Sequence, residues 1–125
     1  MSNDQPFQPL FEQLKNIIDP YANKLICAVD DPTLFYLETT HIMKSKKPLF
    51  FGSVKINKNY VSYHLMPVYV FPELLADISP ELKRRMQGKS CFNFKATDQA
   101  LFDELATLTK AGYQQYSAAG YIKTK

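Results

Sequence analysis

The side chains that most often carry acid–base, nucleophilic or metal chemistry are scarce in this sequence of 125 residues. It contains two histidines, His41 and His64, and two cysteines, Cys27 and Cys91. These residues lack the HxH, HExxH or paired CxxC spacing that brings zinc ligands together. We therefore predict no metal site and no resident cofactor.

The motifs of nucleophilic catalysis and of nucleotide binding are also missing. The chain has no GxSxG motif to present a serine nucleophile. Its four glycines are dispersed, so no Gly-rich loop can hold phosphates. Cys91 follows Lys89 and Ser90, which could activate an exposed thiol, but Cys27 and Cys91 both lie in apolar, strand-like segments and are predicted to be reduced core residues. We assign no catalytic residue and expect a non-enzymatic protein.

Positive charge is concentrated in the middle of the chain, although the net charge is only +3. Residues 39–72 hold no acidic residue and five lysines: Lys44, Lys46, Lys47, Lys55 and Lys58. They are interspersed with Phe50, Tyr60 and Tyr63, a mixture that could bind single-stranded nucleic acid. The alternative is a solvated hairpin whose lysines discourage pairing with further strands. Because arginines are few and the charge density is modest, we favour the hairpin and do not expect a nucleic-acid partner.

Six polar or aromatic residues in or near the basic segment and before the last strand form the candidate ligand-binding set: His41, Lys47, Tyr60, Tyr63, His64 and Lys89. His64 lies on the opposite strand face from Tyr63, so its side chain should point to solvent or into a cleft. The alternative for His64 is a half-buried strand residue without a chemical role. For His41 the alternative is a solvated loop side chain.

The elements that position these residues follow from hydrophobic spacing. Apolar side chains recur at intervals of three and four along residues 7–21 and again along residues 101–116, which predicts an amphipathic helix at each end of the chain. Pro20 should end the first helix near Asp19, and Thr97 should cap the last one. A shorter helix is predicted over residues 79–88.

Extended chain is predicted between these helices. The five strands cover residues 25–29, 34–39, 49–56, 60–66 and 90–95, and a loop covers residues 41–47. Short connections favour a mainly antiparallel five-stranded sheet with helices packed on one face, so the expected fold class is α+β. The length favours a single domain over residues 1–125.

The sequence shows no export or membrane signal. The N-terminus has no basic region followed by an apolar one, and no apolar stretch approaches the roughly 20 residues of a membrane span. We expect a cytoplasmic location and no membrane partner.

Three segments carry a resemblance to a known family: residues 48–52 (PLFFG), 58–67 (KNYVSYHLMP) and 88–94 (GKSCFNF), followed by the long C-terminal helix. Through them the chain resembles the YdhG-like family of bacterial domains of unknown function. The resemblance implies a small α+β fold with an antiparallel sheet flanked by helices. One branch of that family has been linked to frataxin-like iron delivery, so an intracellular iron carrier is an alternative function. Iron carriers of that kind have carboxylate-rich surfaces, whereas acids are sparse here and the net charge is positive.

These observations give one leading functional prediction and two alternatives. The leading prediction is a non-enzymatic cytosolic domain that binds a small ligand or a protein partner through the exposed sheet and the loop at residues 41–47. The alternatives are the iron carrier and a weak single-stranded nucleic-acid binder that uses the basic hairpin. Tyrosines along the last helix also make a homodimer possible.

Overall fold

The computed structural model describes residues 7–122, which form one antiparallel sheet with helices on one side. The spatial order of the strands is β1-β2-β3-β4-β6-β5, and all neighbours are antiparallel. The six strands are β1 (Ile26–Asp31), β2 (Leu34–Ile42), β3 (Pro48–Ile56), β4 (Val61–Leu65), β5 (Met86–Gln87) and β6 (Cys91–Phe94). The predicted α+β class and antiparallel sheet are confirmed.

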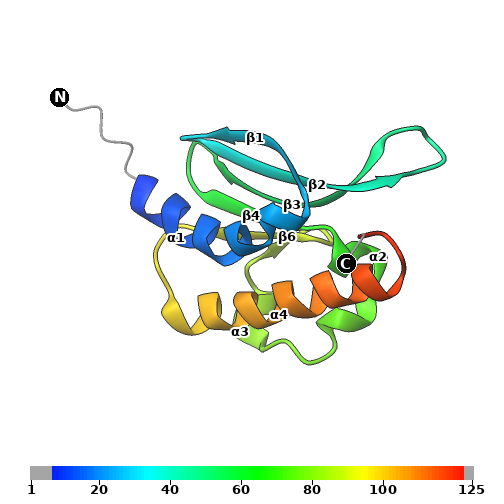
Figure 1. The fold of residues 1–125 in the computed structure, drawn as a ribbon. Coiled ribbons are helices and arrows are strands. Elements are labelled where there is room, and N and C mark those ends of the chain that lie inside the picture. The colour runs from blue at the N-terminus through cyan, green and yellow to red at the C-terminus, as the bar shows by residue number, and fades with distance from the viewer. Residues whose placement is uncertain (1–6, 123–125) are drawn as a thin grey trace.

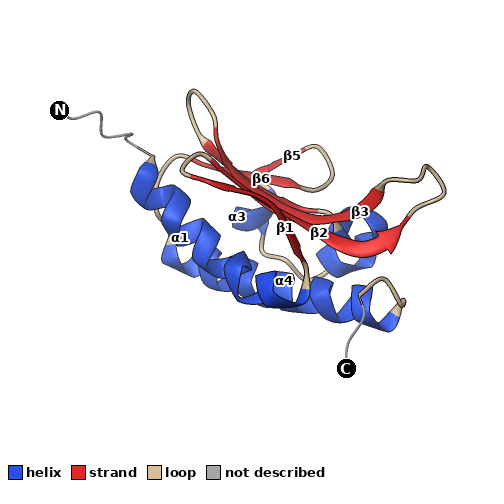
Figure 2. Ribbon diagram, turned by 45° about the horizontal axis from the view of Figure 1, so that its top comes forward, coloured by secondary structure: helices blue, strands red, loops and turns tan. Residues whose placement is uncertain are grey.

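The helices form a second layer. They are α1 (Gln8–Ile18), α2 (Pro67–Val70), α3 (Pro80–Lys83) and α4 (Gln99–Ala118), with 3-10 turns η1 (Asp19–Lys24) and η2 (Pro72–Leu75). In Figure 1, α1 and α4 lie side by side below the sheet, and Figure 2 shows the helices on that same side. No helix of the described residues covers the opposite side, which we call the open face. Across residues 7–122, none of the helices is both long and apolar enough to cross a bilayer.

Alternation along the strands separates the core from the open face. In β4, Val61, Tyr63 and Leu65 are fully buried, whereas Ser62 and His64 between them are partly exposed. Successive side chains of a strand point to opposite sides of the sheet, so one side of β4 faces the helices and the other faces the surface. The predicted opposition of His64 and Tyr63 is confirmed.

Helix α1 packs on the sheet through the stripe that its spacing predicts. Its buried side chains are Leu10, Phe11, Leu14 and Ile18. The helix lies close to the sheet at Gly52 of β3, where an added Cβ would lie 2.5 Å from Ile18 Cδ1 and 2.9 Å from the carbonyl oxygen of His64. A glycine at this position therefore lets the helix close onto the sheet.

Helix α4 is capped one residue later than the sequence suggests. Asp98 is the N-cap, and its Oδ1 accepts a hydrogen bond from the Leu101 N–H at 3.2 Å. Thr97, the predicted cap, instead donates its hydroxyl to Gln13 Oε1 of α1 at 2.7 Å. The helix ends at Ala118, shortly after the predicted apolar spacing along residues 101–116.

Two hydrogen bonds tie α4 to the sheet. The Tyr63 hydroxyl of β4 bonds the Thr109 hydroxyl of α4, and both side chains are fully buried. The Tyr116 hydroxyl donates to the carbonyl oxygen of Phe50 in β3 at 3.0 Å. The hydroxyls of Tyr63, Thr109 and Tyr116 are therefore paired between the two layers.

The segment between β4 and β6 corrects the predicted strand count. Ser79, where the predicted helix begins, caps α3, with the Leu82 N–H donating to its Oγ at 3.1 Å. The helix ends at Lys83 instead of continuing to residue 88. Met86 and Gln87 then pair with β6 and form a sixth strand. Gly88, at φ 77°, makes the tight turn between the two strands. Five strands were predicted because a two-residue strand has no periodicity to detect.

Two further expectations about local structure were wrong. The loop at residues 41–47 is shorter than predicted, because β2 continues through Ile42 and β3 begins at Pro48. Cys27 lies exposed on the edge strand β1 instead of in the core, beside a bulge between Cys27 and Val29. Cys91 is partly exposed, and burial raises the pKa of its thiol, which opposes activation by its neighbours.

Candidate functional site

A row of side chains runs across the open face. Strand pairing places Tyr36, Ser53, His64 and Cys91 beside one another in turn, from β2 to β6. Phe50 stacks on Tyr36 with ring centroids 4.6 Å apart and meets the His64 ring edge-on at 4.7 Å. The sheet thus presents aromatic rings, an imidazole and a thiol on a surface without a helical cover.

His64 is held by Ser90, which lies just before β6. The Ser90 hydroxyl and His64 Nε2 are 2.7 Å apart. Burial lowers the pKa of His64 below its usual 6.5, which favours the neutral imidazole. A neutral imidazole on a serine hydroxyl can act as a base toward a nucleophile. However, Ser90 is only 8% exposed, and within residues 7–122 no carboxylate hydrogen-bonds to the imidazole, so the pair fits a structural role better.

A basic pocket lies farther along β4 and β6 on the open side. Its volume is about 360 Å³, and we call it the basic pocket. The lining residues are Tyr60, Arg84, Arg85, Met86, Gln87, Asn93 and Lys95. Asn93 lies two residues from Cys91 on the same strand, so the pocket continues the row that contains His64.

Several short elements converge to form the basic pocket. The turn between β3 and β4 supplies Tyr60, β5 supplies Met86 and Gln87, and the connection after α3 supplies the two arginines. The Asn93 N–H donates to the carbonyl oxygen of Arg85 at 2.7 Å, which fixes this connection against β6. The cations are therefore carried by backbone that is bonded to the sheet.

The positive charge in the basic pocket is not neutralised. Among residues 7–122 the one ion pair joins Lys15 to Asp30 at 3.0 Å, so Arg84, Arg85 and Lys95 have no carboxylate partner in that range. A smaller adjoining cavity of about 140 Å³ shares Arg85 and Lys95 and includes one carboxylate, Asp98. That carboxylate caps α4. Three cations around one concavity make a site with a strong preference for anions.

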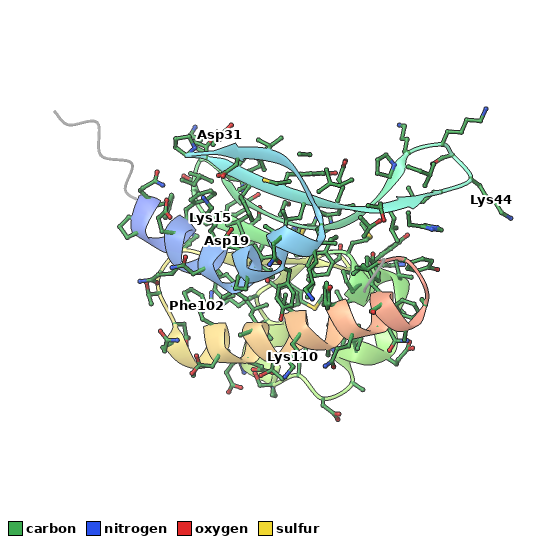
Figure 3. All side chains as sticks on the ribbon, viewed as in Figure 1. Lys15, Asp19, Asp31, Lys44, Phe102 and Lys110 are labelled. Atoms are coloured by element: carbon green, nitrogen blue, oxygen red, sulfur yellow. The ribbon has the colours of Figure 1, made fainter. Side chains whose placement is uncertain are left out.

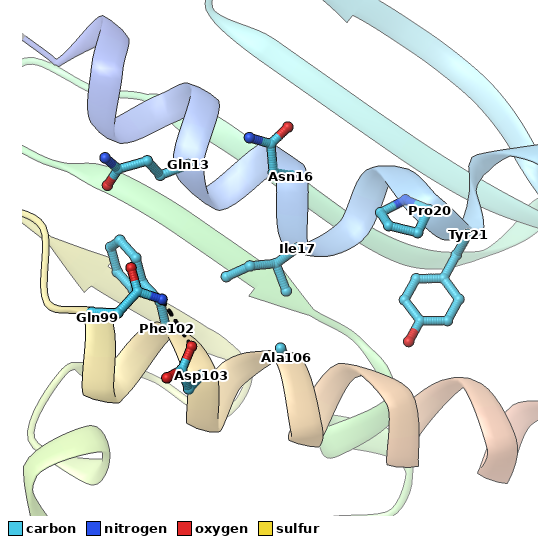
Figure 4. A pocket seen from close by; sticks show the side chains of 9 residues that line it. All are labelled: Gln13, Asn16, Ile17, Pro20, Tyr21, Gln99, Phe102, Asp103 and Ala106. Carbon is cyan, nitrogen blue, oxygen red and sulfur yellow. Dashed lines mark hydrogen bonds between the residues drawn. The ribbon is translucent and has the colours of Figure 1, made fainter.

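A larger groove lies between α1 and α4, on the helical side of the molecule (Figure 4). Its volume is about 470 Å³. Ile17 and Phe102 line it together with amides, and its one charged side chain, Asp103, accepts a hydrogen bond from Gln99 Nε2 at 2.8 Å. This groove offers less charge and fewer free polar groups than the basic pocket, so its size does not make it the better site.

The predicted candidate residues of β4 and its turn have three different environments. Tyr60 lines the basic pocket. His64 lies in the row beside it, bonded to Ser90. Tyr63 is in the core with its hydroxyl on Thr109, so its assignment to a surface site was wrong. The strand alternation that separates His64 from Tyr63 could have excluded it.

The other three candidates lie apart from this pocket. The His41 ring contacts the Tyr121 ring, with centroids 4.7 Å apart. Lys47 is exposed in the turn between β2 and β3. Lys89 is exposed in the turn between β5 and β6 and does not line the pocket. The six predicted residues therefore do not form one site.

Sequence reasoning missed most of the residues that line the basic pocket. Arg84 and Arg85 were assigned to the last turn of a longer helix, where cations are common. The helix ends at Lys83, so Arg84 is its C-cap and Arg85 lies beyond it. The available signal was Lys95, which is the last residue of the predicted strand over residues 90–95 and adds a third cation to the pair.

Among residues 7–122, no three His, Cys, Asp or Glu side chains gather in a group that could hold a metal ion. No model of a protein family, no curated protein and no solved structure matches the chain. The resemblance to the YdhG-like family and the iron-carrier alternative therefore stay predictions.

Proposed function

We propose that the protein is a non-enzymatic binding domain that holds a small anionic ligand in the basic pocket. One observation supports this most directly: Arg84, Arg85 and Lys95 line a pocket that has no carboxylate in its wall. The proposal keeps the predicted small-ligand function and the exposed sheet. It moves the site from the loop at residues 41–47 to the far end of β4 and β6.

The lining groups suit an oxyanion. Each guanidinium can donate two parallel hydrogen bonds to a phosphate or carboxylate group, while Lys95 adds a point charge. The Asn93 amide and the Tyr60 hydroxyl can donate to the remaining oxygens. A volume of about 360 Å³ is at the small end of ligand sites, which are typically about 300–1,000 Å³. Phosphorylated or polycarboxylated small molecules fit this chemistry.

The same lining favours binding over reaction. None of the seven lining residues is Ser, Cys, His, Asp or Glu, the types that usually act as nucleophile or general base. His64, the strongest candidate base, belongs to the row beside the pocket and is bonded to Ser90.

Thermal unfolding with inorganic pyrophosphate at low salt tests the proposal. A ligand at 100 times its dissociation constant stabilises the folded state by about 2.7 kcal/mol, which raises the Tm by several degrees. We expect this rise in the wild type and its loss in the Arg84→Gln/Arg85→Gln variant.

The matched control is Lys24→Gln/Lys110→Gln, which removes the same charge from exposed lysines that do not line the pocket. The control should keep the full Tm rise. No rise in the wild type, or an equal loss in both double variants, would contradict a ligand held by the two arginines.

Single-stranded nucleic acid is a second candidate, favoured by the stacked Tyr36 and Phe50 rings on the same open face as the pocket. Bases could stack on these rings while phosphates contact the cations. If so, a short oligonucleotide would bind more tightly than pyrophosphate, with strong salt dependence. Phe50→Ser would then weaken oligonucleotide binding and leave pyrophosphate binding unchanged.

A further inference from the structure

The turn between β2 and β3 projects past the rest of the molecule. We call residues 42–47 the β2–β3 tip. Figures 1 and 2 both show this hairpin extending beyond the helices, and Figure 3 places Lys44 at its outermost point. A projecting tip can reach a flat surface that the body of the protein cannot contact.

Two adjacent apolar side chains of the tip are exposed. Ile42 is 57% exposed and Met43 is 36% exposed. They are two of the four large hydrophobic residues that the described chain leaves exposed, the others being Ile26 and Tyr69. Neighbouring exposed apolar groups on a projection favour contact with an apolar or interfacial partner.

Three lysines surround these apolar groups. Lys44, Lys46 and Lys47 are all exposed, and residues 39–72 contain no acidic side chain to oppose them. Local hydrogen bonds fix the shape of the turn: the Met43 N–H donates to the Lys47 carbonyl at 2.9 Å, and the Lys46 N–H donates to the Met43 carbonyl at 2.8 Å. The tip thus presents its cations and apolar groups on a preformed turn.

We propose that the β2–β3 tip docks on an anionic membrane surface. Ile42 and Met43 enter the interfacial region, and the three lysines bind lipid phosphates. Charge complementarity selects this partner, because a cationic tip is attracted to an anionic bilayer and is repelled by the same tip of a second copy. The sequence suggested no membrane partner because no segment can span a bilayer, whereas this contact lies at the surface only. It does not depend on the basic pocket.

Cosedimentation with vesicles tests the proposal. One set contains phosphatidylcholine alone, and in the other about a third is replaced by phosphatidylglycerol, at low ionic strength. The wild type should bind the anionic set only. The Lys44→Gln/Lys46→Asn/Lys47→Gln variant should bind about 100-fold more weakly. Lys46 is replaced by Asn because the backbone at this position has a φ of 71°, which Asn adopts more readily than Gln.

Two further variants separate charge from apolar insertion. Lys24→Gln/Lys83→Gln/Lys110→Gln has the same net charge as the tip variant and should bind like the wild type. Ile42→Thr/Met43→Gln should bind more weakly than the wild type but keep its salt dependence.

Several results would overturn the proposal. The first two are no binding of the wild type to anionic vesicles at low salt and equal binding to both vesicle sets. The other two are an equal loss of vesicle binding in the two triple lysine variants and release of bound protein by millimolar inorganic phosphate. The last result would show that free phosphate suffices as the ligand. Preference for an acidic polypeptide over anionic vesicles would assign the tip to a protein partner instead.

Discussion

His64 lies at the centre of the open face, where Ser90 bonds its Nε2 and Phe50 meets its ring. Burial lowers the pKa of this imidazole below 6.5, so the folded protein binds the proton less readily than the unfolded chain does. By linkage, the favourable contribution to stability is fully present above the unfolded pKa. It is lost as the pH falls through the folded pKa.

We therefore predict that the free energy of unfolding declines below about pH 6.5 and that His64→Gln reduces this decline. NMR titration of the imidazole gives its pKa, and urea unfolding between about pH 5 and pH 8 gives the slope. The matched control for loss of an imidazole is His41→Gln. A titration of His64 at or above 6.5 would contradict the prediction.

Prediction of single residues succeeded where the two-residue repeat of a β-strand decides which side of the sheet a side chain faces. The alternation of β4 correctly placed His64 opposite Tyr63. It could not show that Tyr60, in a turn, would meet arginines more than twenty residues away in the sequence. That contact depends on the path of the chain from α3 back to the sheet at β5, which no local sequence pattern predicts.

At the level of elements, the N-terminus of α4 offers a clear test. Asp98 Oδ1 accepts the Leu101 N–H, which would otherwise be unsatisfied in the first helical turn. We predict that Asp98→Ala lowers the free energy of unfolding by about 1 kcal/mol. Urea unfolding at neutral pH measures the change.

Thr97→Ala is the control for this cap. Thr97 makes an exposed hydrogen bond to Gln13 and does not cap the helix, so its removal should cost less than about 0.5 kcal/mol. If Thr97→Ala proved the more harmful change, the cap would be Thr97 as the sequence alone suggested.

The long elements were predictable and the short ones were not. Helices α1 and α4 each repeat their apolar spacing over several turns, so single residues that depart from the spacing do not obscure the helix. Strand β5 and helix α3 contain only two and four residues. Their structures follow from pairing with β6 and from the Ser79 cap, and the basic pocket depends on both.

At the level of the whole molecule, the layers are joined by the buried bond between Tyr63 of β4 and Thr109 of α4. We predict that Tyr63→Phe lowers the free energy of unfolding by about 1–2 kcal/mol, because the Thr109 hydroxyl stays buried without a partner. Thr109→Val should have a similar cost.

The double variant Tyr63→Phe/Thr109→Val should be less destabilised than the sum of the single changes, since both polar groups are then gone. Urea unfolding of all four proteins completes this cycle. Strict additivity would show that the two hydroxyls do not depend on each other.

The two-layer arrangement followed from the sequence, whereas the position of the best site did not. Two amphipathic helices and several alternating strands are enough to predict helices on one side of an antiparallel sheet. The basic pocket instead forms where three separate segments, at residue 60, residues 84–87 and residues 93–95, meet at one corner of that sheet. The homodimer that the tyrosines of the last helix make possible stays a hypothesis.

Both outer strands of the sheet are poorly suited to recruit another chain. Strand β1 carries a bulge and ends in Asp30 and Asp31, and β5 has only two residues. In the described chain, neither edge offers a long, flat run of free backbone donors and acceptors. The protein can thus keep one broad side of its sheet in water with little tendency to grow into amyloid-like fibrils through its edges.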